Sequence, residues 1–335
     1  MKDPELALLI SHPSQEILDG TKLNSYKLCP RKYFFTHILG WKPQEIAQDL
    51  IFGLAGHLAL EHIYEEWKNG NRPTDRIISE AVGIFFGSYR SSIPPELDEL
   101  YPKKPPVHFE SLLRSYISTY FTDKFTVLYT EISGSLPIGR TPSGADKLIY
   151  YRMDAIIEEN KKKQILEHKF SAWGTWQWAT SMELSTQNSI GQVLLYLLFG
   201  EDSRGMLFNG LFMRAPQYKL NGELRANAKE HEFLRLPSNR TLDLIEAYRA
   251  VEESYYDRLQ FDLDLLSSAS VDDPSLKAFP QNCSGCMAYN RTCEFHDICS
   301  GNPNPLTILP SIPIGFKQEF WDTREHDKEY TTKLT

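Results

Sequence analysis

The chain of 335 residues lacks the features that would place it in a membrane or outside the cell. Its N-terminus opens on the charged run Met-Lys-Asp-Pro-Glu, and the apolar stretch that follows is too short for a signal peptide. No segment approaches the ~20 consecutive apolar residues of a membrane helix. No internal repeat or low-complexity tract is present. We therefore expect a cytoplasmic protein without membrane association.

Cysteine is scarce and unevenly placed. Of the five cysteines, Cys29 stands alone near the start, and Cys283, Cys286, Cys293 and Cys299 are clustered near the end. Stable disulfides are rare in the cytosol, where clustered thiolates usually bind metal. Four thiolates fit either a zinc site or an iron–sulfur cluster. The pattern therefore predicts a metal centre and leaves its metal open.

An excess of positive charge is also missing. Lysine and arginine total 36 against 44 acidic residues, which gives a net charge of -8 and a pI of about 5.7. Proteins that coat nucleic acid usually have a basic face, so the balance argues against that class. A nuclease can be acidic overall, because only its groove must be positive. Lys27, Arg31 and Lys32 are candidate DNA contacts, although such runs are more often solvated surface.

Two short strands with chemistry-bearing residues are predicted in the middle of the chain. Residues 152–158 and 164–170 have strand-like composition and are joined by a polar turn. Side chains alternate along a strand, so Glu167 and Lys169 share a face, His168 points away, and Asp154 can meet them from the partner strand. Carboxylates that bind Mg²⁺ or Mn²⁺ beside a lysine suit phosphodiester hydrolysis. A solvated strand face with an ion pair is the ordinary alternative.

Helical segments carry two further candidates. Gln192 and Tyr196 lie one turn apart on an apolar run at 189–199 that ends at Gly200, and His57 lies on an apolar helix after Gly53. Taken singly, a polar edge of a core helix and a buried core histidine are the more common interpretations. Helical periodicity is also present at 76–89, 109–125 and 242–266.

These elements, in this order, resemble the RecB-like branch of the PD-(D/E)XK nucleases, especially its iron–sulfur members. Those include the C-terminal nuclease domain of bacterial AddB, the exonucleases of CRISPR adaptation and phage-encoded relatives. The similarity is carried by Cys-Pro-Arg-Lys-Tyr at 29–33, Gly-x-x-x-His at 53–57, Asp154 with Glu-x-Lys at 167–169, Gln-x-x-x-Tyr at 192–196 and the closing cysteines. It spans about 23–299, most of the chain.

The resemblance implies an α/β fold with a restriction-endonuclease-like core, in which helices flank a central mixed sheet. It also implies a cysteine-ligated cluster that joins the N- and C-terminal segments. The expected organisation is a lead-in at 1–22, a nuclease domain at 23–299 and an extended tail at 300–335. Within the nuclease domain, we expect a helical insertion at about 70–126 and cluster-binding segments at 25–34 and 279–299.

The resemblance also implies roles for single residues. Asp154, Glu167, Lys169, Gln192 and Tyr196 are the expected catalytic residues. The expected ligands of Mg²⁺ or Mn²⁺ are His57, Asp154, Glu167 and the backbone carbonyl of His168.

The expected ligands of a [4Fe–4S] cluster, with zinc as the alternative metal, are Cys29, Cys286, Cys293 and Cys299. The family often spaces its last three cysteines as Cys-x₂-Cys-x₅-Cys, whereas here six residues separate Cys286 from Cys293. Cys283 could replace Cys286 as a ligand.

The implied activity is a metal-dependent DNA exonuclease acting on single strands or ends. It would serve DNA recombination and repair, phage replication or CRISPR adaptation in a bacterial, archaeal or phage-infected cell. A helicase or an integrase-type protein is the expected partner. Two alternatives are a catalytically silent or partner-dependent DNA-binding subunit of the same fold, and a zinc-stabilised structural protein. The tryptophans Trp173, Trp176 and Trp178 could stack on single-stranded bases, although packing against a helix is their more common use.

Overall fold

The hairpin predicted around Glu167 is confirmed in a computed structural model that describes residues 4–172, 174–213, 231–288, 291–326 and 332–334. Strand β3 spans Asp146–Glu159 and strand β4 spans Lys162–Ser171. Their antiparallel ladder begins at Ala155 opposite Leu166. Between the strands, Asn160 and Lys161 have positive φ angles of 53° and 63°. Two such residues form the hairpin turn whose twist matches that of the strands.

The hairpin belongs to a six-stranded mixed sheet with the order β6-β5-β4-β3-β2-β8. Strand β5 is parallel to β4 and antiparallel to β6, and β8 is parallel to β2. The remaining bounds are Thr126–Arg140 for β2, Ser203–Met213 for β5, His231–Ser238 for β6 and Thr332–Leu334 for β8. This mixed sheet and its flanking helices confirm the predicted α/β class with a restriction-endonuclease-like core.

The chain divides into two compact units, each built from separate stretches of sequence. The first unit contains Met1–Ile46, Ser135–Tyr151 and Glu246–Glu329, and the second contains Ala47–Gly134, Arg152–Ile245 and Tyr330–Thr335. The expected boundaries at 22 and 299 therefore fall inside the first unit. All the strand residues predicted to be catalytic lie in the second unit.

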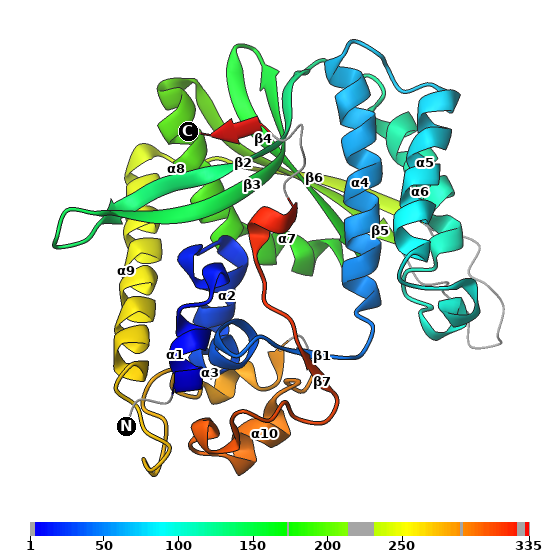
Figure 1. The fold of residues 1–335 in the computed structure, drawn as a ribbon. Coiled ribbons are helices and arrows are strands. Elements are labelled where there is room, and N and C mark those ends of the chain that lie inside the picture. The colour runs from blue at the N-terminus through cyan, green and yellow to red at the C-terminus, as the bar shows by residue number, and fades with distance from the viewer. Residues whose placement is uncertain (1–3, 173, 214–230, 289–290, 327–331, 335) are drawn as a thin grey trace. The chain divides into compact units, whose positions relative to one another are not determined.

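Helices α4, α5 and α6 line one face of the sheet in the second unit (Figure 1). Their apolar sides form one core with strand residues such as Ala155, Leu166 and Leu211, all 0% exposed. Helices α7 and α8 follow β4 in sequence. The bounds are Gln48–Lys68 for α4, Asp75–Arg90 for α5, Phe109–Tyr120 for α6, Thr175–Glu183 for α7 and Thr186–Phe199 for α8. The short 3₁₀ helices of this unit are η3 at Pro95–Leu100, η4 at Pro106–His108 and η5 at Gly200–Asp202.

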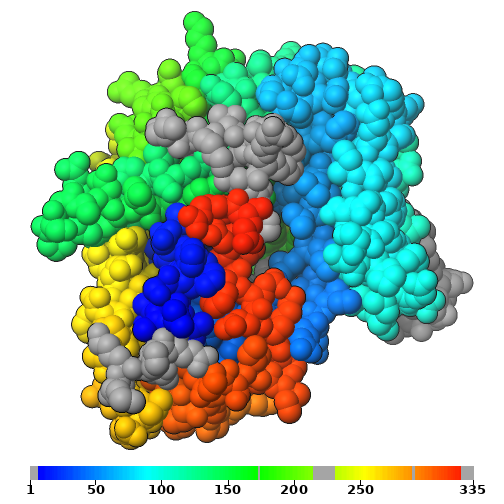
Figure 2. Space-filling view, viewed as in Figure 1, coloured from blue at the N-terminus to red at the C-terminus, as the bar shows by residue number. Residues whose placement is uncertain are grey.

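The first unit brings an N-terminal segment and a C-terminal segment of the chain together. In the space-filling view its N-terminal segment, in blue, lies beside α9 in yellow and the C-terminal segment in orange and red (Figure 2). Strands β1 and β7, Trp41–Pro43 and Phe316–Gln318, pair antiparallel. The helices are α1 at Pro4–Ile10, α2 at Gly20–Leu28, α3 at Pro30–Tyr33, α9 at Leu242–Leu266 (which starts in the second unit) and α10 at His296–Gly301. Single-turn helices are η1 at Pro13–Glu16, η6 at Cys283–Gly285, η8 at Pro305–Ile308 and η9 at Thr323–His326, and a π-helix, η2, spans Phe34–Ile38.

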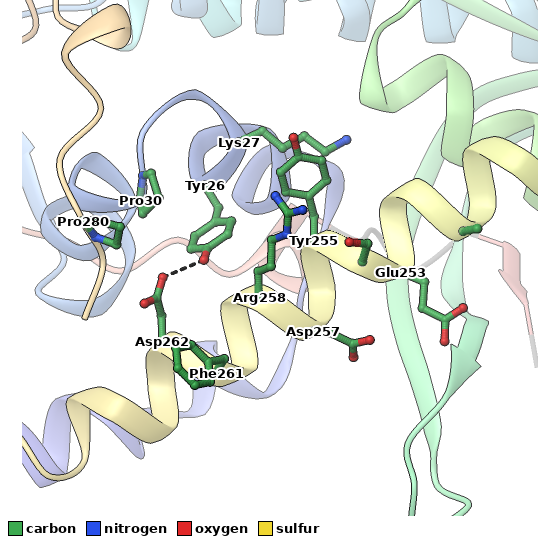
Figure 3. A pocket seen from close by; sticks show the side chains of 12 residues that line it. Tyr26, Lys27, Pro30, Glu253, Tyr255, Asp257, Arg258, Phe261, Asp262 and Pro280 are labelled. Atoms are coloured by element: carbon green, nitrogen blue, oxygen red, sulfur yellow. Dashed lines mark hydrogen bonds between the residues drawn. The ribbon is translucent and has the colours of Figure 1, made fainter. Parts of the chain in front are cut away.

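A buried hydrogen bond ties α2 to α9 in this unit. The hydroxyl of Tyr26 donates to a carboxylate oxygen of Asp262 over 2.6 Å, at one wall of a groove of about 790 Å³ (Figure 3). Burial and the hydrogen bond to Asp262 both raise the pKa of Tyr26. The tyrosine therefore stays protonated and keeps donating across the helix pair.

None of the helices in the described part of the chain combines the length and the hydrophobicity that a bilayer crossing requires.

One glycine sets how closely α4 approaches β4. A Cβ atom added at Gly56 would lie 2.4 Å from the ring of Phe170 on β4, whereas Gly53, one turn earlier, has nothing within 4 Å of its Cβ position. The Phe170 ring has little room to yield, because it packs against Phe52 and Phe109 at centroid distances of 6.0 and 6.1 Å. His57, the next residue on α4, depends on this close approach for its position.

Substituting the two glycines separately tests this packing. Gly56→Ala overpacks the contact with Phe170, and we expect it to lower the free energy of unfolding by about 1–3 kcal/mol. Gly53→Ala meets open space and should be neutral or stabilising by up to about 1 kcal/mol, because alanine favours helix more than glycine does. Urea unfolding of both variants measures the difference. Equal stabilities would contradict the role given to Gly56.

Candidate active site

Asp154 and Glu167 meet where the ladder between β3 and β4 ends. The last paired residues are Ala155 and Leu166, so the next positions along the two strands are Asp154 and Glu167. The backbone N–H of His168, which lies beyond the last residue pair between β3 and β4, donates to Oδ2 of Asp154 over 2.7 Å. This hydrogen bond holds the Asp154 carboxylate beside β4.

Glu167 and Lys169 share a face of β4, as their spacing predicts. The Lys169 ammonium lies 2.8 Å from Oε1 of Glu167, and the side-chain amide of Gln187 donates to the same oxygen over 2.5 Å. Glu167 is 2% exposed, and its second oxygen, Oε2, has no hydrogen-bond partner among the described residues. Burying a carboxylate oxygen without a donor costs free energy, so this atom is a candidate ligand for a cation.

His57 reaches Asp154 from α4. Its Nδ1 lies 3.1 Å from Oδ1 of Asp154. Burial by itself would lower the pKa of His57, but the Asp154 carboxylate outweighs it and raises the pKa above the usual value. The two oxygens of Asp154 are therefore bound by different elements, one by α4 and the other by β4.

The two carboxylates have opposite electrostatic surroundings. Burial raises the pKa of Glu167, and the negative charge of Asp154 raises it further. Burial also acts against ionisation of Asp154, but His57 and then His168 and Lys169 lower its pKa below the ordinary range. The pKa of Lys169 is raised because Glu167 and Asp154 outweigh the effect of burial. Such clustering of perturbed groups is typical of functional sites.

The side chain of His168 lies on the opposite face and is structural. Asn209 donates to its Nδ1 over 2.8 Å and also donates to the hydroxyl of Tyr116 over 2.8 Å. Arg235 donates to the amide oxygen of Asn209 over 3.4 Å, which fixes the orientation of that amide. Burial lowers the pKa of His168 to about 3. The imidazole is therefore neutral, and only the backbone of His168 is directed toward Asp154.

No hydrogen bond to Lys169 is found for Gln192 or Tyr196, the two predicted site residues of α8, among the described residues. The Gln192 amide donates to Asn188 and Ser238, over 2.7 and 3.2 Å. These partners are not the predicted site residues of β3 and β4. Tyr196 is half-buried. The residue of α8 that contacts Glu167 is instead Gln187, which was not among the predicted site residues.

The missed residue had a local signal. Ser185 is the N-cap of α8, because its hydroxyl accepts from the N–H of Asn188 over 3.1 Å. Serine is a preferred N-cap, so it could have moved the predicted start of this helix from 189 to 186 and placed Gln187 in the first turn.

The oxygen donors of Asp154 and Glu167 are of the kind that a hard divalent cation prefers. Asp154 and Glu167 supply carboxylate oxygens, the donors that Mg²⁺ and Mn²⁺ prefer, and Oε2 of Glu167 is without a partner in the described structure. In this structure, however, the Glu167 carboxylate is hydrogen-bonded to Lys169, and the Asp154 carboxylate is hydrogen-bonded to His57. In the described ranges, no three or more His, Cys, Asp or Glu side chains are already arranged to hold a metal.

The cysteines converge in the first unit. All five are free and line one cavity of about 180 Å³. Burial, and then the neighbouring thiols of Cys29 and Cys286, raise the pKa of Cys299, and burial and the thiol of Cys29 contribute to the raised pKa of Cys293. Cys283 is the exposed member.

Main-chain and side-chain amides surround these sulfur atoms. The N–H of Asn282 donates to Sγ of Cys29 over 3.4 Å, and Gln281 donates to Sγ of Cys299 over 3.2 Å. The Asn282 side chain also donates to the carbonyl of Leu28 over 2.8 Å. The segments at 25–34 and 279–299 are thus joined by direct contacts within the first unit.

The candidate DNA contacts near these cysteines differ in accessibility. Arg31 is 2% exposed, and its guanidinium donates to the carbonyls of Phe279 and Leu276 over 2.9 Å each. The expectation that Arg31 contacts DNA is therefore corrected, since its donors bind backbone inside the protein. Lys27 and Lys32 are partly exposed and pair with Glu252 and Glu294.

Fold and site together define an α/β protein with a buried glutamate, a partly buried aspartate and a lysine on adjacent strands of a mixed sheet. The chain belongs to the PD-(D/E)XK nuclease superfamily, whose sequence model matches residues 20–300. Members of this superfamily are generally nucleases that use Mg²⁺ or Mn²⁺. No curated protein matches the chain. A solved structure titled "Crystal structure of SSO0001" is similar at 13% sequence identity, over 59% of this chain and 74% of that chain, with a TM-score of 0.24.

The structural role of His168 can be tested through its partner. Asn209→Leu leaves the buried Nδ1 of His168 without a donor, and we expect a loss of about 1–3 kcal/mol in the free energy of unfolding. His168→Leu in the Asn209→Leu background removes the orphaned group. Its additional cost should therefore be smaller than the cost of His168→Leu alone. Strictly additive losses in denaturant titrations would show that the two side chains are not coupled.

Proposed function

We propose that this chain is a metal-dependent deoxyribonuclease of the RecB-like branch that hydrolyses phosphodiester bonds as an exonuclease on single strands or ends. The observation that supports it is the convergence of Asp154, Glu167 and Lys169, with a buried oxygen of Glu167 left without a donor among the described residues. A purely structural ion pair would use both oxygens of a carboxylate this deeply buried.

The site residues divide the chemistry among them. Asp154, Glu167 and the backbone carbonyl of His168 would hold Mg²⁺ or Mn²⁺, and the imidazole of His57 would favour Mn²⁺ because nitrogen suits the softer ion. The bound cation would supply charge stabilisation for the phosphate and lower the pKa of the attacking water. Lys169 would orient that water with its ammonium, since its position is fixed by Glu167. Gln187 keeps Glu167 in the rotamer that faces Lys169.

The cysteine cavity is proposed to hold a [4Fe–4S] cluster bound by Cys29, Cys286, Cys293 and Cys299. Three observations support this assignment: the shared cavity, the mutual electrostatic influence of Cys29, Cys286 and Cys299, and the amide donors on two of the sulfurs. Hydrogen bonds to sulfur stabilise cluster thiolates. The exposure of Cys283 favours Cys286 as the ligand. Such a cluster would fasten α2 and α3 to the C-terminal segment.

The proposed setting is DNA recombination and repair, phage replication or CRISPR adaptation, with a helicase or integrase-type partner. This setting rests on the resemblance to the RecB-like branch. Measuring DNA cleavage does not require a partner protein to be known.

Cleavage of end-labelled single- and double-stranded DNA, with an anaerobic preparation and Mg²⁺ or Mn²⁺, tests the nuclease. We expect Lys169→Ala and Glu167→Gln to cut at least about 100-fold more slowly than wild type, because each removes a group that acts on the developing charge. Both variants should remain folded by circular dichroism. Lys163→Ala is the matched control: Lys163 is on the same strand and face, paired with Glu158 at 3.3 Å, and its loss should leave cutting unchanged.

Other outcomes would point elsewhere. Equal cutting by wild type and both site variants would indicate a contaminating nuclease. No cutting by a folded wild type would favour the silent or partner-dependent subunit of the same fold.

Serine substitutions separate the two candidate ligands of the cluster. After anaerobic purification we expect Cys286→Ser to lose the brown colour and most of the bound iron, and Cys283→Ser to retain both. Iron and zinc analysis with visible absorption spectra provides the measurement. The reverse pattern would make Cys283 the ligand, and a colourless wild type containing zinc would replace the iron–sulfur assignment with a zinc site.

A further inference from the structure

Helix α7 covers the sheet next to Lys169, on the face that carries Lys169 and Glu167. Lys169 is in register with Gly210 on β5, and neighbours in register point to the same face of a sheet. A Cβ atom at Gly210 would lie 3.0 Å from the Trp178 ring. Trp178 is 4% exposed and packs edge-on against Phe212 with centroids 5.1 Å apart. The helix is therefore anchored by Trp178 beside the lysine.

Trp176 lies on the opposite side of the same helix. Two residues apart in an α-helix means about 200° of rotation, so Trp176 points away from the sheet when Trp178 points into it. Its side chain is 78% exposed, and it is the one tryptophan among the described residues that is mainly in solvent. An exposed indole of this size offers an aromatic face on which a nucleic-acid base can stack.

The surroundings of Trp176 suit a polyanion. The first turn of α7 has no acidic residue, and Glu183, in the last turn, is the only charged side chain of the helix. The helix N-terminus contributes partial positive charge at the Trp176 end. A phosphate backbone could therefore pass this end of the helix without meeting a like charge on it.

We propose that Trp176 is a stacking platform for an unpaired base of the DNA strand held at Lys169 and Glu167. The inference rests on the proposed nuclease function and names its substrate class as single-stranded DNA. An unpaired base offers an open π-face to the indole, whereas a base inside a duplex is already stacked on its neighbours. Trp176 thereby becomes a specificity-determining residue, and Trp178 is the positioning residue that fixes the helix.

Binding measurements test the platform apart from catalysis. Fluorescence anisotropy with labelled single-stranded and duplex oligonucleotides, in Ca²⁺ in place of the catalytic cation, gives the affinities. We expect Trp176→Ala to weaken single-strand binding by about 5- to 100-fold and to change duplex binding little. Trp176→Phe keeps a π-face and should stay close to wild type. Leu184→Ala is the matched control, because Leu184 is 70% exposed at the other end of the same helix but has no aromatic ring.

A scan with abasic nucleotides distinguishes base stacking from a structural role of Trp176. A purely structural change would not remove the dependence of affinity on one particular base. Single abasic nucleotides are placed in turn along the oligonucleotide. Wild type should lose affinity most at one position, the one whose base stacks on the indole. In Trp176→Ala this penalty should disappear, because the ring that used the base is gone.

The outcomes separate the two proposals. Single-strand affinity of Trp176→Ala equal to wild type, an equal loss in Leu184→Ala, or an abasic penalty that persists in Trp176→Ala would overturn the stacking platform. Absence of single-strand binding in wild type would also overturn it, even if duplex DNA is cut. A wild type that shows the expected binding pattern but no metal-dependent cutting supports the platform and overturns the nuclease.

Discussion

The close approach of two carboxylates, one buried and one partly buried, at the open end of one hairpin is the constraint on which the site depends. Asp154 and Glu167 cannot both be ionised at so little exposure to solvent without compensating positive charge. Neighbouring groups supply this positive charge or donate hydrogen bonds. His57 comes from α4, the backbone N–H of His168 from β4, and Lys169 from the same strand as Glu167. The remaining oxygen of Glu167 has no hydrogen-bond partner among the described residues, and it is the atom to which the proposed metal would bind.

The two faces of the sheet carry residues with different roles. On one face, His168 is neutral and enclosed by Asn209 and its partners, which keeps the strand rigid below the site. On the other, Glu167 and Lys169 lie under α7 and α8, where Gln187 and Trp178 fix the neighbouring positions. Period-two alternation thus places a structural histidine between two site residues. A rigid inner face is what allows the reactive face to hold like charges close together.

Several features could be predicted from local sequence because they depend on neighbours in the chain. The hairpin at 152–170 follows from strand propensity and a polar turn, and the alternation of Glu167, His168 and Lys169 follows from it. The end of α8 at Gly200 follows from the residue's freedom to adopt φ = 56°. The fold class was predicted from the resemblance to the PD-(D/E)XK nucleases, which the motifs carry through their order along the chain.

Local sequence is enough to predict which residues share a strand face or a helix turn. Which elements come together depends on the tertiary packing. Gln187 and Gln192 are equally plausible on α8, and packing against β4 selects the first. Arg31 seemed an open cation until the C-terminal segment enclosed it with carbonyl groups. Trp176 and Trp178 look alike in sequence, and Gly210 on a distant strand makes one an anchor and leaves the other in solvent. Contacts between distant segments carry no local signature, because they depend on the shape of the assembled sheet.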